Sequence, residues 1–206
     1  MYDLEKKFKL LLNISPSLIF INGKSCCGKS TLSKKFAEHG YRVIETDEII
    51  RKLARKFRMK AKDAFGFNVY RNQGNRKMIN MFIREVRYHI HKNCNKKLVI
   101  EGGLSDSTLI NNVFRDINYT FIFLNPVSTE RYYKRIYKRF IADVENKSRL
   151  MPIWGKDIWE LIDKHGYKSK EVKQFIKKKA KEYKETSDKK LEYLRKDEFN
   201  LFIINV

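Results

Sequence analysis

Residues 23–31 have the types and spacing needed to bind phosphate. Gly23 and Gly28 enclose Lys24, Ser25, Cys26 and Cys27, and Lys29, Ser30 and Thr31 follow, giving the pattern G-x-x-x-x-G-K-S. Glycine permits backbone angles that aim several N–H groups at one phosphate, and the dipole of a following helix adds attraction. Lys29 would meet the β and γ phosphates of a nucleotide, and the Ser30 hydroxyl would ligate Mg²⁺. We predict that residues 23–31 bind a nucleotide, with Lys29 catalytic and Ser30 the metal ligand.

Strands and helices alternate around this loop. We expect strands at 18–21, 41–45, 97–101, 119–124 and 199–206, and helices at 3–12, 30–40, after 47, at 78–90, 107–114, from 128, at 157–165 and at 172–194. Apolar runs that are not interrupted by polar residues are typical of strands buried on both faces. The alternation predicts an α/β fold, a three-layer sandwich with a five-stranded, mainly parallel sheet.

Four polar residues, Asn22, Asp47, Glu101 and Asn125, stand at the ends of expected strands. Sites on parallel sheets lie at the carboxyl ends of the strands, so these side chains should converge near one edge. Asp47 suits a base that orients a hydroxyl and accepts its proton, or a helix N-cap. Glu101 suits an acid that holds Mg²⁺ through water or orients the acceptor, or an ordinary strand-end carboxylate.

The loop also carries a family resemblance. The run from Ile21 to Leu32 resembles the first loop of small P-loop kinases, and its N-G-x-S-x-x-G-K-S form is similar to that of chloramphenicol phosphotransferases. Asp47 follows Lys29 by eighteen residues, where the kinases that phosphorylate hydroxyl groups keep a catalytic acid. Residues 129–139 are similar to the start of the lid helix of phage-type polynucleotide kinases. The resemblance implies a P-loop NTP hydrolase/kinase fold that uses ATP and Mg²⁺.

Several arginines could stabilise the negative charge that develops on the phosphoryl group during its transfer. Arg135 is our first choice for the catalytic lid arginine, with Arg139 or Arg149 second, and Arg139 is also predicted to bind nucleotide. Arg51 and Arg55, one helical turn apart, would bind an acceptor phosphate together with Glu101, bidentate geometry being the advantage of arginine over lysine. The alternative for Arg51 and Arg55 is a solvated helix face.

Two further groups are ambiguous. The aromatic residues Phe65, Phe67 and Tyr70 could stack a base or pack in the core. Cys26 and Cys27 lie near Lys29 and a helix N-terminus, an environment that favours thiolate, although incidental small residues are the simpler interpretation.

The organisation of the chain follows from these assignments. We expect a single domain over 1–206, with an N-terminal helix at 1–14, an acceptor-binding insertion at 48–77 and a lid at 128–155. The sequence has no apolar run that could span a membrane, no secretory signal and no disulfide framework, so we expect a cytoplasmic protein without membrane contact. The sequence leaves the oligomeric state open.

The net charge of +21 is weak information about partners, because 31 of the 45 basic residues are lysine in a composition that favours A/T-rich codons. The function we expect is transfer of the γ-phosphoryl group of ATP to a nucleoside, nucleotide or similar small molecule. One alternative is a polynucleotide 5′-hydroxyl kinase, which leaves nucleic acid open as a partner. Another is a nucleotide-binding regulatory module with little turnover.

Overall fold

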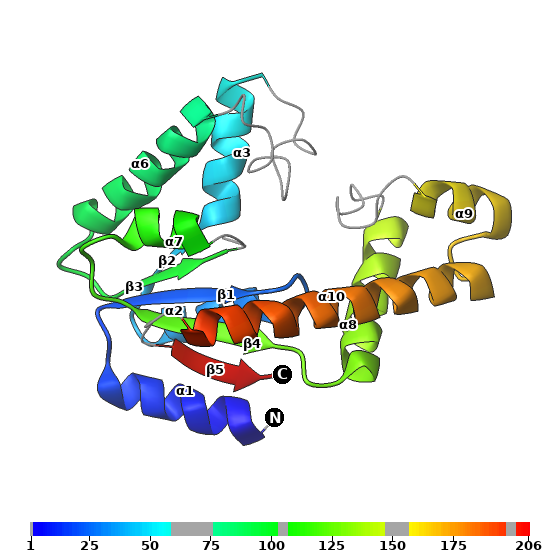
Figure 1. The fold of residues 1–206 in the computed structure, drawn as a ribbon, viewed down its shortest axis with the longest axis horizontal. Helices are drawn as coiled ribbons and strands as arrows, with labels where there is room; N and C mark the ends of the chain where they lie inside the picture. The colour runs from blue at the N-terminus through cyan, green and yellow to red at the C-terminus, as the bar shows by residue number, and fades with distance from the viewer. Residues whose placement is uncertain (1, 59–75, 103–106, 147–156, 197–200) are drawn as a thin grey trace.

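The computed structural model describes residues 2–58, 76–102, 107–146, 157–196 and 201–206 (Figure 1). Its strands are β1 (Leu18–Gly23), β2 (Arg42–Glu45), β3 (Leu98–Glu101), β4 (Thr120–Asn125) and β5 (Leu201–Asn205). Its helices are α1 (Tyr2–Ile14), α2 (Lys29–Glu38), α3 (Thr46–Lys56), α6 (Arg76–Lys92), α7 (Ser107–Phe114), α8 (Thr129–Glu145), α9 (Asp157–His165) and α10 (Lys170–Lys196). Each expected element is present, with ends shifted by a few residues.

The five strands form one sheet in the order β2-β3-β1-β4-β5, and every pairing between neighbours is parallel. The register places Ile21 of β1 beside Glu101 of β3, and Glu45 of β2 beside Glu101 on its other side. All residues of β1, β3 and β4 are buried, as expected for strands that helices cover on both faces. The predicted α/β sandwich with a five-stranded sheet is confirmed.

Side-chain alternation along the strands divides the interior into two cores. On β1, Leu18 and Phe20 join the core formed with α3, α6, α7 and the last turns of α10. Ile19 and Ile21 point the other way, into the core formed with α1, α2, α8, α9 and the first half of α10. The period of two along a strand produces this division, and the helices on either side complete the three layers.

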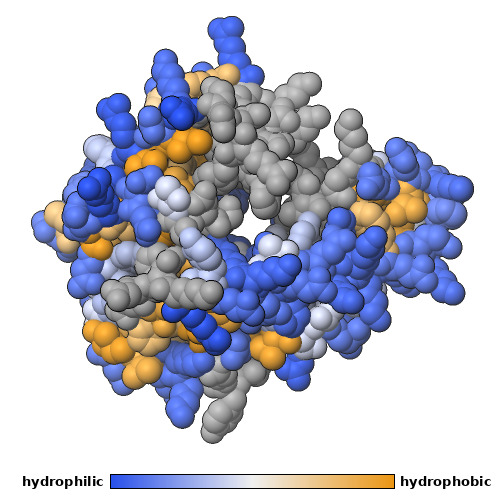
Figure 2. All heavy atoms as spheres, viewed as in Figure 1, coloured by the Kyte–Doolittle hydropathy of each residue, from blue (hydrophilic) through white to orange (hydrophobic). Residues whose placement is uncertain are grey.

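Two groups of helices extend away from the sheet, one above β2 and the other past the end of β1 (Figure 1). Helices α3 and α6 form one arm, and α8 and α9 form the other. Helix α10 runs from the second arm back across the sheet, where Leu191 and Leu194 are buried. Figure 2 shows the molecule hollowed between the two arms.

No helix within the described ranges is long and apolar enough to cross a membrane. All three cysteines, Cys26, Cys27 and Cys94, are free thiols. Several predicted features lie outside the described residues: Arg149, the aromatic residues Phe65, Phe67 and Tyr70, most of the expected insertion at 48–77 and the last part of the expected lid at 128–155.

Candidate active site

The predicted phosphate loop connects β1 to α2, and a different structural constraint requires glycine at each of its two glycine positions. Gly23 has φ of 149°, and a Cβ there would lie 2.7 Å from the carbonyl oxygen of Leu124 on β4. Gly28 is the N-cap of α2 with φ of 93°, a left-handed conformation that favours glycine. Cys26 has φ of 63°, which is uncommon for a residue with a side chain. Such strain is typical of functional loops.

Lys29 lies across this loop. Its Nζ donates hydrogen bonds to the carbonyl oxygens of Gly23 and Lys24, each at 3.1 Å. At the entry to the loop, the buried Asn22 accepts a hydrogen bond at 2.6 Å from the Gly23 N–H through Oδ1. These contacts place the ammonium over the loop, where it can neutralise a bound phosphate.

Glu101 is the acid that meets the loop. The Ser30 hydroxyl donates to Glu101 Oε1 at 3.2 Å, and the side chain of Glu101 is buried. The pKa of the Glu101 carboxyl is raised, mainly by burial and further by the negative charges of Glu45 and Asp47. The charge of Lys29 and the hydrogen bond from Ser30 lower this pKa but do not outweigh burial. Sequence reasoning predicted both residues but not the hydrogen bond that joins them.

The donor set fits a magnesium ion. Mg²⁺ prefers oxygen ligands and is usually held by one or two carboxylates together with substrate phosphates. The Ser30 hydroxyl and the Glu101 carboxylate supply two such oxygens side by side. No group of three or more His, Cys, Asp or Glu side chains that could hold a metal occurs in the described part of the chain, so a metal here would depend on phosphate oxygens for further ligands.

Asp47 differs from its predicted position. Strand β2 ends at Glu45, which is the N-cap of α3 in extended conformation, and α3 begins at Thr46. Asp47 is therefore in the first turn of the helix, and both the strand-end and the N-cap assignments were wrong. Its exposed carboxylate nevertheless lies close enough to Glu101 to raise the pKa of that group. Both predicted carboxylates are therefore on the same side of the sheet end, near enough for their charges to interact.

A tight contact sets the start of α3 against the end of β3. Thr46 is fully buried, and a Cβ on Gly102 would lie 1.6 Å from Thr46 Oγ1 and 2.8 Å from Thr46 Cβ. Only glycine leaves room for the helix at this distance. Because Asp47 follows Thr46 and Glu101 precedes Gly102, the contact fixes the backbone positions from which the two carboxylates project. The sequence analysis did not predict this role of Gly102.

Asp47, Arg51 and Arg55 are spaced four residues apart, so they share one face of α3. All three are exposed. Arg51 Nη1 donates to Glu48 Oε1 at 2.6 Å. An exposed ion pair of this kind contributes little to stability, about 0.3–0.5 kcal/mol. The arginines therefore continue from Asp47 along the arm, as the acceptor-binding interpretation requires.

The side chain of Asn125 is bound by α10. Its Oδ1 accepts from the Ser187 hydroxyl at 2.9 Å, and its Nδ2 donates to Asp188 Oδ1 at 3.3 Å. These hydrogen bonds connect α10, at Ser187 and Asp188, to the end of β4. Asn125 ends β4 at the expected edge, since the preceding residue Leu124 pairs with Gly23, but α10 passes this strand end and takes up the polar groups of its side chain.

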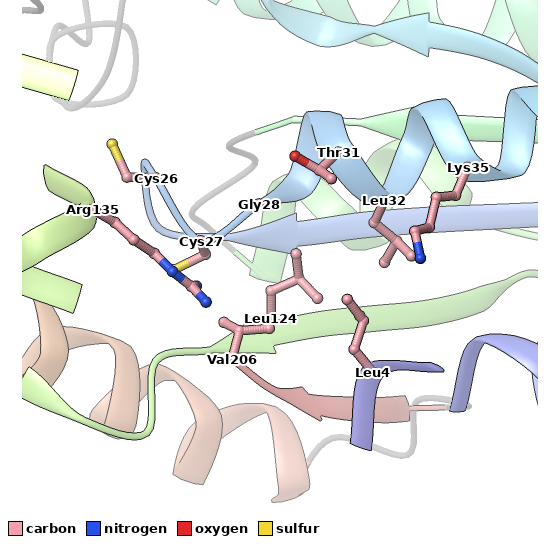
Figure 3. A pocket seen from close by; sticks show the side chains of 10 residues that line it. All are labelled: Leu4, Cys26, Cys27, Gly28, Thr31, Leu32, Lys35, Leu124, Arg135 and Val206. Atoms are coloured by element: carbon pink, nitrogen blue, oxygen red, sulfur yellow. The ribbon is translucent and has the colours of Figure 1, made fainter. Parts of the chain in front are cut away.

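Helix α8 places Arg135 beside the phosphate loop. Arg135 lines a pocket of about 330 Å³ together with Leu4, Cys26, Cys27, Gly28, Thr31, Leu32, Lys35, Leu124 and Val206 (Figure 3). Figure 3 shows its side chain extending from α8 toward Cys27. Arg139, one turn further along, donates from Nε to the buried Asp143 Oδ1 at 2.8 Å. Of the two described candidates, Arg135 lines the pocket beside the loop, whereas Arg139 is paired with Asp143 and acts on Cys26 of the loop through its charge.

Two tyrosines that sequence reasoning missed contact the loop, one from α8 and one from α10. The buried Tyr132 donates its hydroxyl proton to the carbonyl oxygen of Ser25 at 2.8 Å, and burial raises the pKa of its phenol. The Lys24 ammonium lies 6.0 Å from the ring centroid of Tyr183 on α10, and burial lowers the pKa of this lysine. Tyr132 lies on the apolar stripe of α8, a pattern that signals a core residue rather than a contact with the loop.

The cysteines of the loop are not thiolates. Burial raises the pKa of the Cys27 thiol to about 11 and raises that of Cys26 as well, and in both cases it outweighs the nearby positive charges. The expectation of an environment that favours thiolate was wrong for this reason. Both side chains line the pocket as small, neutral groups.

Comparison with known proteins bears on this arrangement. A family model described as an AAA domain matches residues 19–149. Among solved structures, the chain is similar to dephospho-CoA kinase from Campylobacter jejuni, with a TM-score of 0.44 and 16% identity over 92% of this chain and 89% of that chain. No curated protein sequence matches. The range of the family match runs from β1 past α8, and it includes the loop, Asp47, Glu101 and Arg135.

Proposed function

This chain belongs to the AAA domain family of P-loop proteins, and from that premise we propose that it is an ATP-dependent kinase that transfers the γ-phosphoryl group to a nucleoside, nucleotide or similar small molecule. The observation that carries the proposal is the hydrogen bond from the Ser30 hydroxyl to the buried Glu101, a carboxyl whose pKa the charges of both Lys29 and Asp47 influence. A loop that binds phosphate needs no second carboxylate at its mouth, whereas transfer to a hydroxyl group needs a proton acceptor there.

The donor triphosphate would bind with its β and γ phosphates in the loop. Lys29 would exchange its two carbonyl contacts for phosphate oxygens and supply the charge. Ser30 and Glu101 would hold Mg²⁺, which neutralises charge on the β and γ oxygens when bound. The pocket next to Gly28 and Thr31 is lined by aliphatic side chains and would receive the nucleoside of the donor.

The transfer itself would proceed on the Asp47 side of the loop. The acceptor hydroxyl oxygen forms a bond to the γ phosphorus, the bond from that phosphorus to the β–γ bridging oxygen breaks, and ADP leaves. The hydroxyl proton passes to the Asp47 carboxylate. Phosphoryl transfer depends mostly on positioning and charge, so Arg135 would stabilise the transferring group from the side of α8. Arg139 would assist in nucleotide binding.

The acceptor would lie along the first arm. Arg51 and Arg55 continue from Asp47 on the same face of α3 and would bind an acceptor phosphate, with Glu101 orienting the group that is phosphorylated. We retain one domain over residues 1–206, with 48–77 as the acceptor-binding insertion and 128–155 as the lid.

The test uses the purified chain, Mg²⁺ and radiolabelled ATP with a panel of nucleosides, nucleoside monophosphates and 5′-hydroxyl oligonucleotides. We expect label to appear on a small-molecule acceptor and to be lost with Lys29→Ala, while Lys34→Ala, a change to an exposed lysine of the same helix, should keep full transfer. Transfer that survives Lys29→Ala would contradict the proposal. Tight ATP binding without transfer to any acceptor would favour a regulatory module, and label on the oligonucleotide alone would favour a polynucleotide kinase.

A further inference from the structure

Helix α1 forms one wall of the pocket that adjoins the phosphate loop, although the proposed reaction does not use it. Leu4 of α1 lines the pocket opposite Leu32 of α2 (Figure 3). The helix is anchored there by buried Phe8 and Leu11, and by Lys7, whose Nζ donates to the carbonyl oxygen of Ile203 at 2.7 Å. The position of α1 is therefore defined by packing and hydrogen bonding.

Lys35 is the positively charged residue of this pocket that lies furthest along α2 from the loop. It follows Gly28 by seven residues, which at the helical rise is roughly 10 Å along the axis. A nucleoside whose phosphates sit in the loop and which extends beneath α2 would bring its base toward Lys35. Gly28, Thr31, Leu32 and Lys35 all line the pocket, so they mark a continuous path along α2.

The Lys35 ammonium is held in place by α1. It forms an ion pair with Glu5 Oε1, and it lies 5.6 Å from the ring centroid of Phe8. An ammonium has three donors, so the bond to Glu5 leaves capacity for another acceptor. Its side chain is 31% exposed, which places it at the mouth of the pocket rather than free in solvent.

We infer that Lys35 donates a hydrogen bond to the purine base of the donor nucleotide, and that Glu5 of α1 is the positioning residue that aims it. The inference rests on the proposed function, since it assumes that the loop binds a triphosphate. A flat base would be buried between the aliphatic side chains of the pocket, those of Leu4, Leu32, Leu124 and Val206. The Lys35 ammonium would then meet the hydrogen-bond acceptor atoms on the edge of the base that is furthest from the ribose. A purine reaches further from the ribose than a pyrimidine, so the contact selects purines.

Calorimetric binding without acceptor tests this with three probes: ATP, CTP and inorganic tripolyphosphate, which lacks a nucleoside. We expect Lys35→Met to weaken ATP binding about tenfold and to reduce the preference for ATP over CTP by a similar factor. Tripolyphosphate affinity should not change, which also demonstrates that the variant is folded. Lys34→Met, the matched exposed control, should bind all three probes normally. Unchanged ATP affinity in Lys35→Met, or an equal loss for ATP and tripolyphosphate, would overturn the inference.

A double-mutant cycle tests Glu5. Glu5→Gln should weaken ATP binding in the otherwise native chain and have no further effect when Lys35→Met is present, since Glu5 acts through Lys35. Additive effects would remove Glu5 from the inference. Lys29→Ala distinguishes a failure of the proposed function: this variant should lose both ATP and tripolyphosphate, and if it loses neither, the phosphate loop itself is wrongly assigned.

Discussion

The contact between Gly102 and Thr46 makes Gly102→Ala the most informative single change. A methyl group at this position would lie 1.6 Å from Thr46 Oγ1 and 2.8 Å from Thr46 Cβ. Rotation of the threonine side chain could move Oγ1 but not Cβ, which belongs to the first turn of α3. The start of the helix must therefore move away from the end of β3, and Asp47 moves with it.

The size of the effect follows from this geometry. Carbon atoms pack at about 3.5–4.0 Å, so the separation from Thr46 Cβ has to grow by roughly 1 Å. A misplacement of about 1 Å in a reacting group can reduce the rate by about 100-fold, or about 2.7 kcal/mol in activation free energy. Overpacking should also lower the free energy of unfolding by about 1–3 kcal/mol. The displaced atoms belong to α3, whereas the loop itself connects β1 to α2, so ATP affinity should fall much less than kcat.

The measurement compares kcat with the Kd for ATP in the same preparation, together with a thermal melt. Gly40→Ala is the matched control: Gly40 has φ of 82° and has no neighbour within 4 Å of an added Cβ, so the substitution strains the backbone without displacing α3. It should lower Tm but leave kcat unchanged. The reasoning is refuted if Gly102→Ala keeps native kcat, or if its ATP affinity falls as far as kcat does.

Three other outcomes are expected. Asp47→Asn should lower kcat by about 10²–10⁴-fold with little change in the Kd for ATP, and a parallel loss of both in steady-state and binding assays would indicate a structural role instead. Burial raises the pKa of Glu101 above its usual 4.5, so ionisation of this carboxyl lowers the stability of the fold as pH rises above that value. Glu101→Gln should therefore raise Tm near neutral pH but not below pH 4.5. The same variant should weaken Mg²⁺-dependent ATP binding. An unchanged difference in Tm across the two pH ranges would argue against this. With its pKa raised to about 11, Cys27 should react with iodoacetamide at neutral pH more slowly than the exposed Cys94, as peptide mass analysis can measure; faster labelling of Cys27 would contradict the assigned burial.

The phosphate loop and the sheet could be predicted because local rules determine both. Binding a phosphate through backbone N–H groups requires glycines and a lysine at fixed spacing, and strands buried on both faces are continuously apolar. The approach of Asp47 to Glu101 was also predictable, since the carboxyl ends of parallel strands share one edge. The error at Asp47 was local: Thr46 is already helical, so the aspartate moves from the strand end into the first turn.

What could not be predicted depends on contacts between distant segments. Asn125 has the type and position of a site residue, and only the path of α10 assigns it to Ser187 and Asp188. Burial of Cys27 depends on the packing of α8 against the loop, so the charge of nearby Lys29 alone gave the wrong direction for its pKa. The space left by Gly102 is visible only once Thr46 is placed against it.

The two separate cores bear on how such a protein can change over generations. Donor-side elements α1, α2 and α8 pack on one face of the sheet, and α3, which carries Asp47, packs with α6 and α7 on the other. Substitutions that reshape one core therefore reach the opposite half through the strands between them and through α10, which contributes to both cores. A lineage could drift in acceptor preference on the α3 side while its use of the donor stays intact, and a laboratory library confined to α3 and α6 would sample the same freedom.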